Sequence, residues 1–138
     1  PANDSTLFML RMPLPLSDPQ LKIEKDWKVR PWFFRTAMGE YPVYLTALRI
    51  GDVVLAGTPC DFSGEFSYQL NAVASWRPGS QLMVTSFNGG YIGYVTPLER
   101  YDRNHYETRL MNWYAPGTGE YIEECLYKLI PVMLQHSK

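Results

Sequence analysis

Two apolar segments separated by a tight turn constrain the fold more than any other feature of the sequence. Residues 41–50 place apolar side chains at every second position, which is the period of a half-buried strand. Gly51-Asp52 is a turn signal, and the next segment, Val53-Val54-Leu55-Ala56, is continuously apolar, as in strands buried on both faces. The sequence therefore predicts a hairpin whose second strand enters the core.

Further segments extend this hairpin into an α/β pattern. Residues 7–12 predict a short strand before the proline-rich loop 13–20. Residues 62–76 have apolar side chains three or four positions apart, which predicts a helix, and residues 81–87 predict another strand. This order of elements predicts a mixed sheet flanked by helices.

The C-terminal segment predicts a second helix. Its apolar stripe runs from Ile122 to Leu134, and Pro116-Gly117-Thr118-Gly119 precedes it. We expect Thr118 to be the N-cap, with Glu120 in the first turn. Pro131 should kink this helix or end its regular part, because proline lacks the backbone donor.

Composition narrows the classes of function. The net charge is −1 over 138 residues and no basic run exceeds two residues, so no nucleic-acid partner is expected. No apolar run reaches the roughly 18–20 residues of a membrane span. Cys60 and Cys125 do not make a disulfide framework. The chain begins at Pro1 without an initiator methionine, which is the pattern of a processed chain or a fragment.

The usual catalytic motifs are absent, so chemistry must come from less familiar patterns. The sequence has no Cys-x-x-Cys, His-Glu-x-x-His, Gly-x-Ser-x-Gly or Walker-type loop. The histidines are His105 and His136; His105 is either catalytic or a surface residue in a polar loop.

Two segments are candidates for a site. Gly57-Thr58-Pro59-Cys60-Asp61-Phe62 follows the buried strand, at the end where α/β sheets hold ligands. Asp61 is either a functional carboxylate or a cap of the following helix. The second segment, residues 87–107, is rich in tyrosine and follows Asn88-Gly89-Gly90. Its hydroxyls could donate to an oxyanion or bind a metal, or could simply be buried and bonded to backbone.

These residues resemble the neutral, non-lysosomal ceramidases. That family has a strand ending in Ile-Gly, an apolar strand and then Gly-x-Pro-Gly-Glu-Phe, where this chain has Ile50-Gly51 and, after its apolar strand, residues 57–62. The family continues with Asn, Tyr-x-x-Tyr-[Ile/Val]-Thr, Glu-x-Tyr and Tyr-Glu. The matching positions here are Asn88, Tyr91, Tyr94-Val95-Thr96, Glu99, Tyr101 and Tyr106-Glu107. The resemblance covers roughly residues 43–130, and the tyrosine block is its most specific part.

The resemblance implies a zinc site. In that family, zinc activates a water that attacks an amide carbonyl, and its ligands are two earlier histidines, the Glu of Pro-Gly-Glu and the Tyr before Val-Thr. By position, Asp61 and Tyr94 would be metal ligands here, and Tyr106 would be the catalytic residue that stabilises the oxyanion. Glu65 is a second choice for the carboxylate ligand. The two further zinc ligands are expected outside this chain.

The resemblance also implies a function and a context. Residues 1–138 would be a C-terminal portion of a larger α/β hydrolase-type catalytic domain, with residues 1–40 unassigned. It would take part in zinc-dependent hydrolysis of a ceramide-like or other N-acyl amide, in sphingolipid metabolism. An N-terminal region or a second chain would complete the domain, in a secreted or extracytoplasmic protein.

Two departures from the family pattern support an alternative. Asp61 stands where the family has Glu, and Cys60 stands where it has Gly, although a Cys60 thiolate could itself bind zinc. These changes favour a non-catalytic ceramidase-like domain that binds a ligand or partner. The presence of Tyr94, Tyr106 and Glu107 favours the enzyme.

Overall fold

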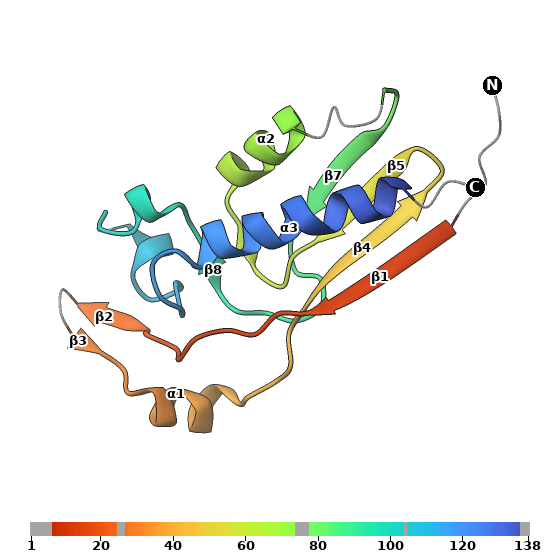
Figure 1. Cartoon of the computed structure of the whole chain (residues 1–138). Helices are drawn as coiled ribbons and strands as arrows, with labels where there is room; N and C mark the ends of the chain where they lie inside the picture. Colours follow the sequence, from red (N-terminus) through yellow and green to blue (C-terminus); the bar gives the residue numbers. More distant parts are fainter. Residues whose placement is uncertain (1–6, 25–26, 74–77, 104, 136–138) are drawn as a thin grey trace.

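A four-stranded mixed sheet with helices packed on one face forms the centre of the molecule (Figure 1). The computed structural model describes residues 7–24, 27–73, 78–103 and 105–135. The strand order is β1 (Leu7–Pro13), β4 (Tyr44–Ile50), β5 (Val53–Gly57) and β7 (Gln81–Thr85). The first two pairings are antiparallel and the third is parallel. The predicted α/β fold with a mixed sheet is therefore confirmed.

The other elements surround this sheet and extend it at one end. They are β2 (Lys22–Glu24), β3 (Trp27–Lys28), α1 (Pro31–Met38), β6 (Asp61–Phe62), α2 (Gly64–Val73), β8 (Tyr94–Val95), the 3-10 turns η1 (Leu98–Arg100) and η2 (Tyr106–Thr108), and α3 (Thr118–Gln135). A short parallel ladder joins β6 to β8. No helix in the described part of the chain is long and apolar enough to cross a membrane.

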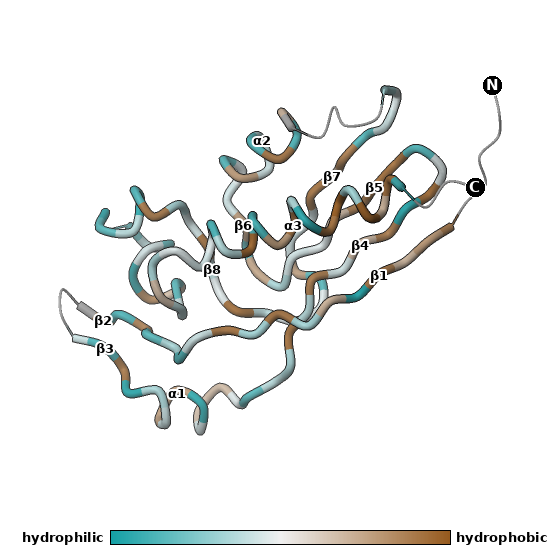
Figure 2. Tube along the Cα trace, viewed as in Figure 1, coloured by the Kyte–Doolittle hydropathy of each residue, from teal (hydrophilic) through white to brown (hydrophobic). Residues whose placement is uncertain are grey.

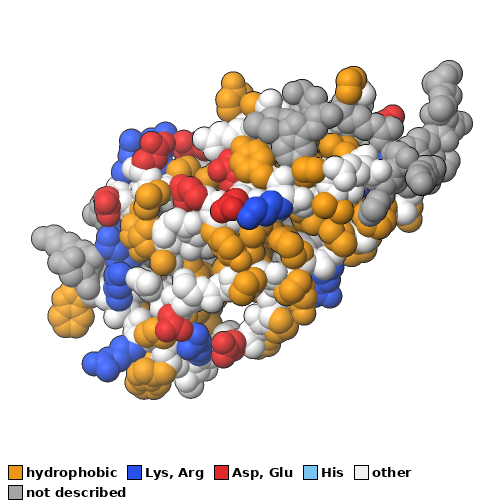
Figure 3. Space-filling model, viewed as in Figure 1, with side chains coloured by type: hydrophobic (Ala, Val, Ile, Leu, Met, Phe, Trp, Pro, Cys, Tyr) orange, Lys and Arg blue, Asp and Glu red, His pale blue; other side chains and the backbone are white. Residues whose placement is uncertain are grey.

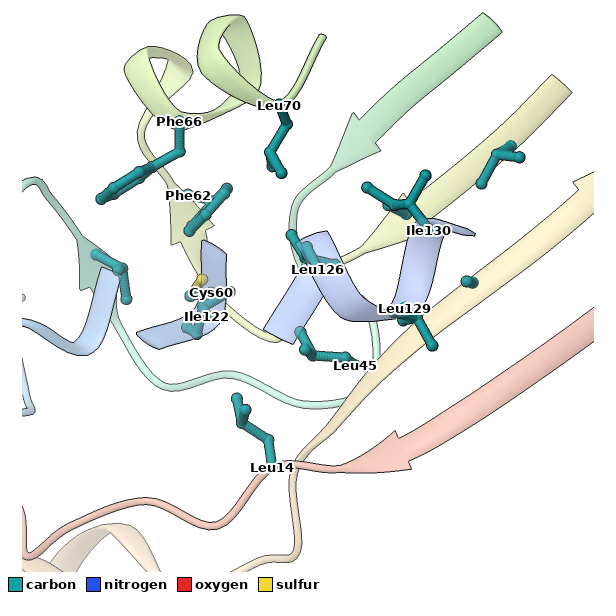
Figure 4. Packing of buried hydrophobic residues seen from close by; sticks show 14 of the residues in the cluster. Leu14, Leu45, Cys60, Phe62, Phe66, Leu70, Ile122, Leu126, Leu129 and Ile130 are labelled. Atoms are coloured by element: carbon teal, nitrogen blue, oxygen red, sulfur yellow. The ribbon is translucent and has the colours of Figure 1, made fainter. Parts of the chain in front are cut away.

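The predicted hairpin is the centre of the core. Leu45 and Ala47 of β4 and Val54 and Ala56 of β5 are buried on one face of the sheet. Figure 4 shows how α2 and α3 pack over this face. The α3 residues in the cluster are Ile122, Leu126, Leu129, Ile130 and Met133, and those of α2 are Phe66 and Leu70. The helical stripe read from the sequence is thus the buried face of α3.

The opposite face of the sheet is also apolar, but the core does not cover it. We call it the open sheet face. It consists of Leu7 and Met9 of β1, Leu48 and Ile50 of β4, Val53 and Leu55 of β5, and Met83 of β7, which the strand register places side by side. None of the seven belongs to the buried cluster, and four of them are more than half exposed. Figure 2 shows the apolar residues that run along these strands.

Two sequence predictions need correction, and one of the two effects predicted for Pro131 is excluded. The helix predicted at residues 62–76 begins at Gly64, because Phe62 pairs with Val95 in the β6–β8 ladder; residues 74–76 lie outside the described part. Thr118 is not the N-cap of α3. Gly117 holds that place, since its carbonyl accepts from the Tyr121 amide at 3.0 Å. Pro131 does not end the helix, which runs to Gln135.

Charged groups on the helix side of the molecule are scattered. Figure 3 shows basic side chains at several separate places on this face, among acidic and hydrophobic ones. On α3, Lys128 pairs with Glu124 one turn earlier, at 2.7 Å. Such mixed charges do not form a surface that would follow a phosphate backbone.

A buried arginine ties α3 to the hairpin. The Arg49 side chain is fully buried on β4; its Nε donates to the Gly51 carbonyl at 2.7 Å and its Nη1 to the Met133 carbonyl at 3.1 Å. Carbonyls in the last turn of a helix lack intrahelical partners, so this bond satisfies one of them. Arg49 therefore fixes the C-terminal part of α3 against the β4–β5 turn.

We expect Arg49→Met to lower the free energy of unfolding by about 2–4 kcal/mol, because two buried carbonyls lose a charged donor. Urea denaturation followed by circular dichroism measures the change. Arg11→Met is the control on the neighbouring strand, where the exposed guanidinium lies 3.6 Å from the Tyr44 ring centre. That loss should cost about 1 kcal/mol or less. Equal losses in both variants would contradict the role given to Arg49.

Candidate functional site

The β6–β8 ladder sets Asp61 directly beside Tyr94. The two residues are partners in its parallel register. The Asp61 amide donates to the Gly93 carbonyl at 3.0 Å, and the Tyr94 amide donates to the Met111 carbonyl at 2.7 Å. Tyr94 is therefore held by backbone bonds to chain segments on both sides. Two residues that lie 33 positions apart in the sequence are brought together by this pairing.

The side chains of this pair influence each other electrostatically. Asp61 raises the pKa of Tyr94, chiefly as an acceptor for the Tyr94 hydroxyl and also through its negative charge. Tyr94 is thus a neutral phenol at neutral pH. The Tyr94 hydroxyl therefore lies beside a carboxylate.

Tyr106 lies against Tyr94. The two ring centres are 5.9 Å apart and the rings are nearly perpendicular, at 79°. Tyr106 opens η2, a turn held by Thr108, whose hydroxyl accepts from the His105 amide at 3.2 Å and donates to the Arg103 carbonyl. The structure therefore brings together all three residues of the predicted site. We call them the Asp61–Tyr94–Tyr106 cluster.

Tyr91 is a fourth residue beside the cluster. Its pKa is raised first by burial, and then by the charge of Asp61 and by Tyr106. Its ring also contacts Trp113 edge-on, with centres 5.1 Å apart. Tyr91 was part of the family motif, which was the signal that could have identified it. Trp113 stands outside those motifs and carried no such signal.

Cys60 belongs to the core and not to the cluster. Its side chain is fully buried and packs in the main hydrophobic cluster. Burial is the main cause that raises the pKa of this thiol, to about 12. A thiolate is the form that ligates metals, so the Cys60 thiol is poorly suited to that role.

The remaining alternatives from the sequence concern Glu65, the capping interpretation of Asp61, and His105. Both carboxylate oxygens of Glu65 accept from the Arg100 guanidinium at 3.1 Å, so this side chain forms a surface ion pair. Asp61 does not cap α2, because it lies in β6, and Ser63 precedes the helix with its hydroxyl 3.4 Å from the Glu65 amide. His105 is exposed, as its surface interpretation predicted.

The donor set of the cluster fits part of a metal site. A zinc ion takes four ligands from nitrogen, sulfur and oxygen atoms. Asp61 and Tyr94, partners in the β6–β8 register, offer two oxygen donors. Within the described ranges, no three His, Cys, Asp or Glu side chains are grouped so that they could hold a metal. Among the described residues, Asp61 and Tyr94 would therefore fill two of the four coordination positions of a zinc ion.

Comparison with known proteins identifies the fold. Neutral ceramidase from Pseudomonas aeruginosa matches 64% of this chain with a TM-score of 0.56 and 23% sequence identity. A structure of ceramidase complexed with C2 matches with the same coverage, score and identity. The chain spans 15% and 14% of the lengths of those two proteins. No protein-family model and no curated protein matches the sequence. The fold therefore resembles that of part of neutral ceramidase, as the sequence motifs predicted.

Gly93 fixes the backbone directly before Tyr94, and we expect Gly93→Ala to disturb the cluster. Its φ is +82°, and an added Cβ would meet the Met111 carbonyl and the Trp113 ring. The strain and the clash together should cost about 2–4 kcal/mol of unfolding free energy.

Gly79→Ala is a matched control, because its φ is +88° but an added Cβ would meet nothing within 4 Å. That variant should lose only the left-handed penalty of about 1 kcal/mol. Thermal denaturation of both variants measures the difference. If the two lose the same stability, the close approach at Gly93 is not what matters.

Proposed function

We propose that this chain supplies part of the active site of a zinc-dependent amidohydrolase that cleaves a ceramide-like or other N-acyl amide. The observation that carries the proposal is the pairing of Asp61 with Tyr94 in the β6–β8 ladder, with the Tyr106 ring against Tyr94. These are the residues that the ceramidase-like motifs assign to the metal and the oxyanion. The fold similarity to part of neutral ceramidase supports the assignment.

Asp61 and Tyr94 would hold the metal through their oxygens. When bound, zinc lowers the pKa of a coordinated water to about 7 and polarises the amide carbonyl. The register of β6 and β8 keeps both side chains on one side of the ladder, so their oxygens converge before any ion arrives. Two further ligands, expected to be histidines, would come from an N-terminal region or a second chain.

Tyr106 would stabilise the oxyanion. Its side chain is 59% exposed, so its hydroxyl can reach a substrate, while its ring packs on Tyr94. A donor that is already oriented pays no reorganisation cost when negative charge develops on the carbonyl oxygen. The backbone and hydroxyl bonds around Thr108 hold the turn that carries Tyr106.

The open sheet face supports the proposal that residues 1–138 are a C-terminal portion of a larger catalytic domain. Large exposed apolar patches mark surfaces that another part covers. The seven side chains of this face would be buried by the part that also completes the zinc site. An extracytoplasmic location is proposed on the same family resemblance.

The alternative is a non-catalytic ceramidase-like domain that binds a ligand or partner. It is favoured by Asp61, whose side chain is one methylene shorter than the glutamate of the family motif. The substitution of Cys60 for the glycine of that motif points the same way, because this side chain contributes packing and not chemistry. Metal content and turnover separate the two functions.

The zinc content of the protein tests the proposed metal site. The full-length protein that contains this chain should hold about one zinc per assembled site, measured by inductively coupled plasma mass spectrometry. Asp61→Asn should weaken zinc binding at least tenfold, because one ligand loses its charge. Glu65→Gln is the control, since the Glu65 carboxylate pairs with Arg100, and it should keep its zinc. Absence of zinc after zinc is supplied would favour the non-catalytic alternative. Equal loss in both variants would contradict the choice of Asp61 over Glu65 as the carboxylate ligand.

The turnover number tests the role proposed for Tyr106. Tyr106→Phe should lower kcat for an N-acyl amide by about 10²–10³-fold, with little change in KM, because it removes a donor used in the transition state. The thermal midpoint should stay the same, since this side chain is exposed. Tyr68→Phe, at an exposed position of α2, controls for the loss of a surface hydroxyl. An unchanged kcat in Tyr106→Phe would remove this residue from the mechanism.

A further inference from the structure

A cavity of about 450 Å³ lies beside the Asp61–Tyr94–Tyr106 cluster. Its walls come from segments far apart in the sequence: the loop after β1, helix α1, the loop before β8 and the segment after η2. Its apolar lining includes Leu14, Phe34, Met38, Tyr91, Ile92 and Trp113. Its volume is within the roughly 300–1,000 Å³ of small-molecule sites.

Aromatic residues connect this cavity with the cluster. Tyr91 and Ile92 line the cavity. The chain continues from them into Gly93 and Tyr94, and the Gly93 carbonyl accepts from the Asp61 amide at 3.0 Å. Trp113 contacts both Tyr91 and Phe34, with ring centres 5.1 and 5.5 Å away. The wall of the cavity is therefore continuous along the chain with the cluster.

The two charged side chains in the lining, Arg35 and Glu40, pair with each other. Arg35 lines the cavity, but its guanidinium bonds to Asp18 at 2.5 Å and lies 3.5 Å from Glu40. Pairing on both sides leaves this arginine poorly available to an anionic ligand. The remaining apolar and aromatic wall suits an uncharged, flexible hydrocarbon group.

We propose that this cavity binds the hydrocarbon part of the acyl chain of the amide substrate, whose carbonyl then faces the Asp61–Tyr94–Tyr106 cluster. The proposal rests on the proposed function for its substrate. Leu14, Phe34 and Met38 precede the segment that carries the family motifs, so this wall is a feature of the chain's own N-terminal part. Selection for acyl-chain length would therefore be set by residues outside those motifs.

The test uses the full-length protein and dodecanol, which carries an alkyl chain but no bond to cleave. Isothermal titration calorimetry should show binding that Met38→Trp weakens at least tenfold, because the indole fills space at the wall. Phe34→Leu is a milder second variant, and it should weaken binding several-fold. Tyr68→Trp places the same indole at an exposed position of α2, away from the lining, and should bind as the wild type does.

Turnover gives an independent readout. Met38→Trp should lower kcat/KM for a dodecanoyl amide at least tenfold more than for a hexanoyl amide. Unchanged dodecanol binding in both Met38→Trp and Phe34→Leu, or equal loss in Tyr68→Trp, would overturn the proposal. Hydrolysis that ignores chain length in every variant would also overturn it and leave the hydrolase intact. Dodecanol binding as expected without hydrolysis of any amide would support the cavity and overturn the hydrolase.

Discussion

The pairing of two very short strands is the constraint on which the candidate site depends. β6 and β8 contribute only two residues each, yet their parallel register sets Asp61 beside Tyr94. Such a ladder could not persist alone, because two-stranded sheets are marginal in water. It is held because Phe62 and Val95 are buried in the core cluster beneath α2 and α3. The chemistry of the surface layer is thus fixed by apolar packing directly below it.

The two faces of the central sheet divide the roles of the chain. One face packs against α2 and α3 and keeps the β6–β8 ladder in place. The open sheet face presents seven apolar side chains on the opposite side. Under the proposed function, the two further zinc ligands and a cover for the open sheet face would be two aspects of one requirement. A single complementary region could provide both, which would make zinc binding depend on correct assembly of the domain.

Sequence reasoning predicted the elements that have a strong period and the residues that have a motif. Periodicity predicts the hairpin and the buried stripe of α3. The motif resemblance assigns Asp61, Tyr94 and Tyr106 to one site, and the structure brings these three residues together. Periodicity could not reveal that Phe62 lies in a strand, because a two-residue ladder has no period of its own. It could not reveal the aromatic cavity either. Trp113 and Phe34 meet only through long-range packing, which local patterns do not encode.

The effect of Asp61 on the Tyr94 hydroxyl bears on the choice between enzyme and binding domain. A tyrosine ligates a metal as phenolate, but the neighbouring carboxylate favours the protonated phenol. Under the proposed function, Tyr94 would keep its proton while the site is empty and would lose it when Asp61 and Tyr94 hold a metal ion. Metal affinity must then rise with pH, because binding releases that proton. A domain that only binds a neutral ligand has no such dependence, so the Tyr94 proton distinguishes the two functions.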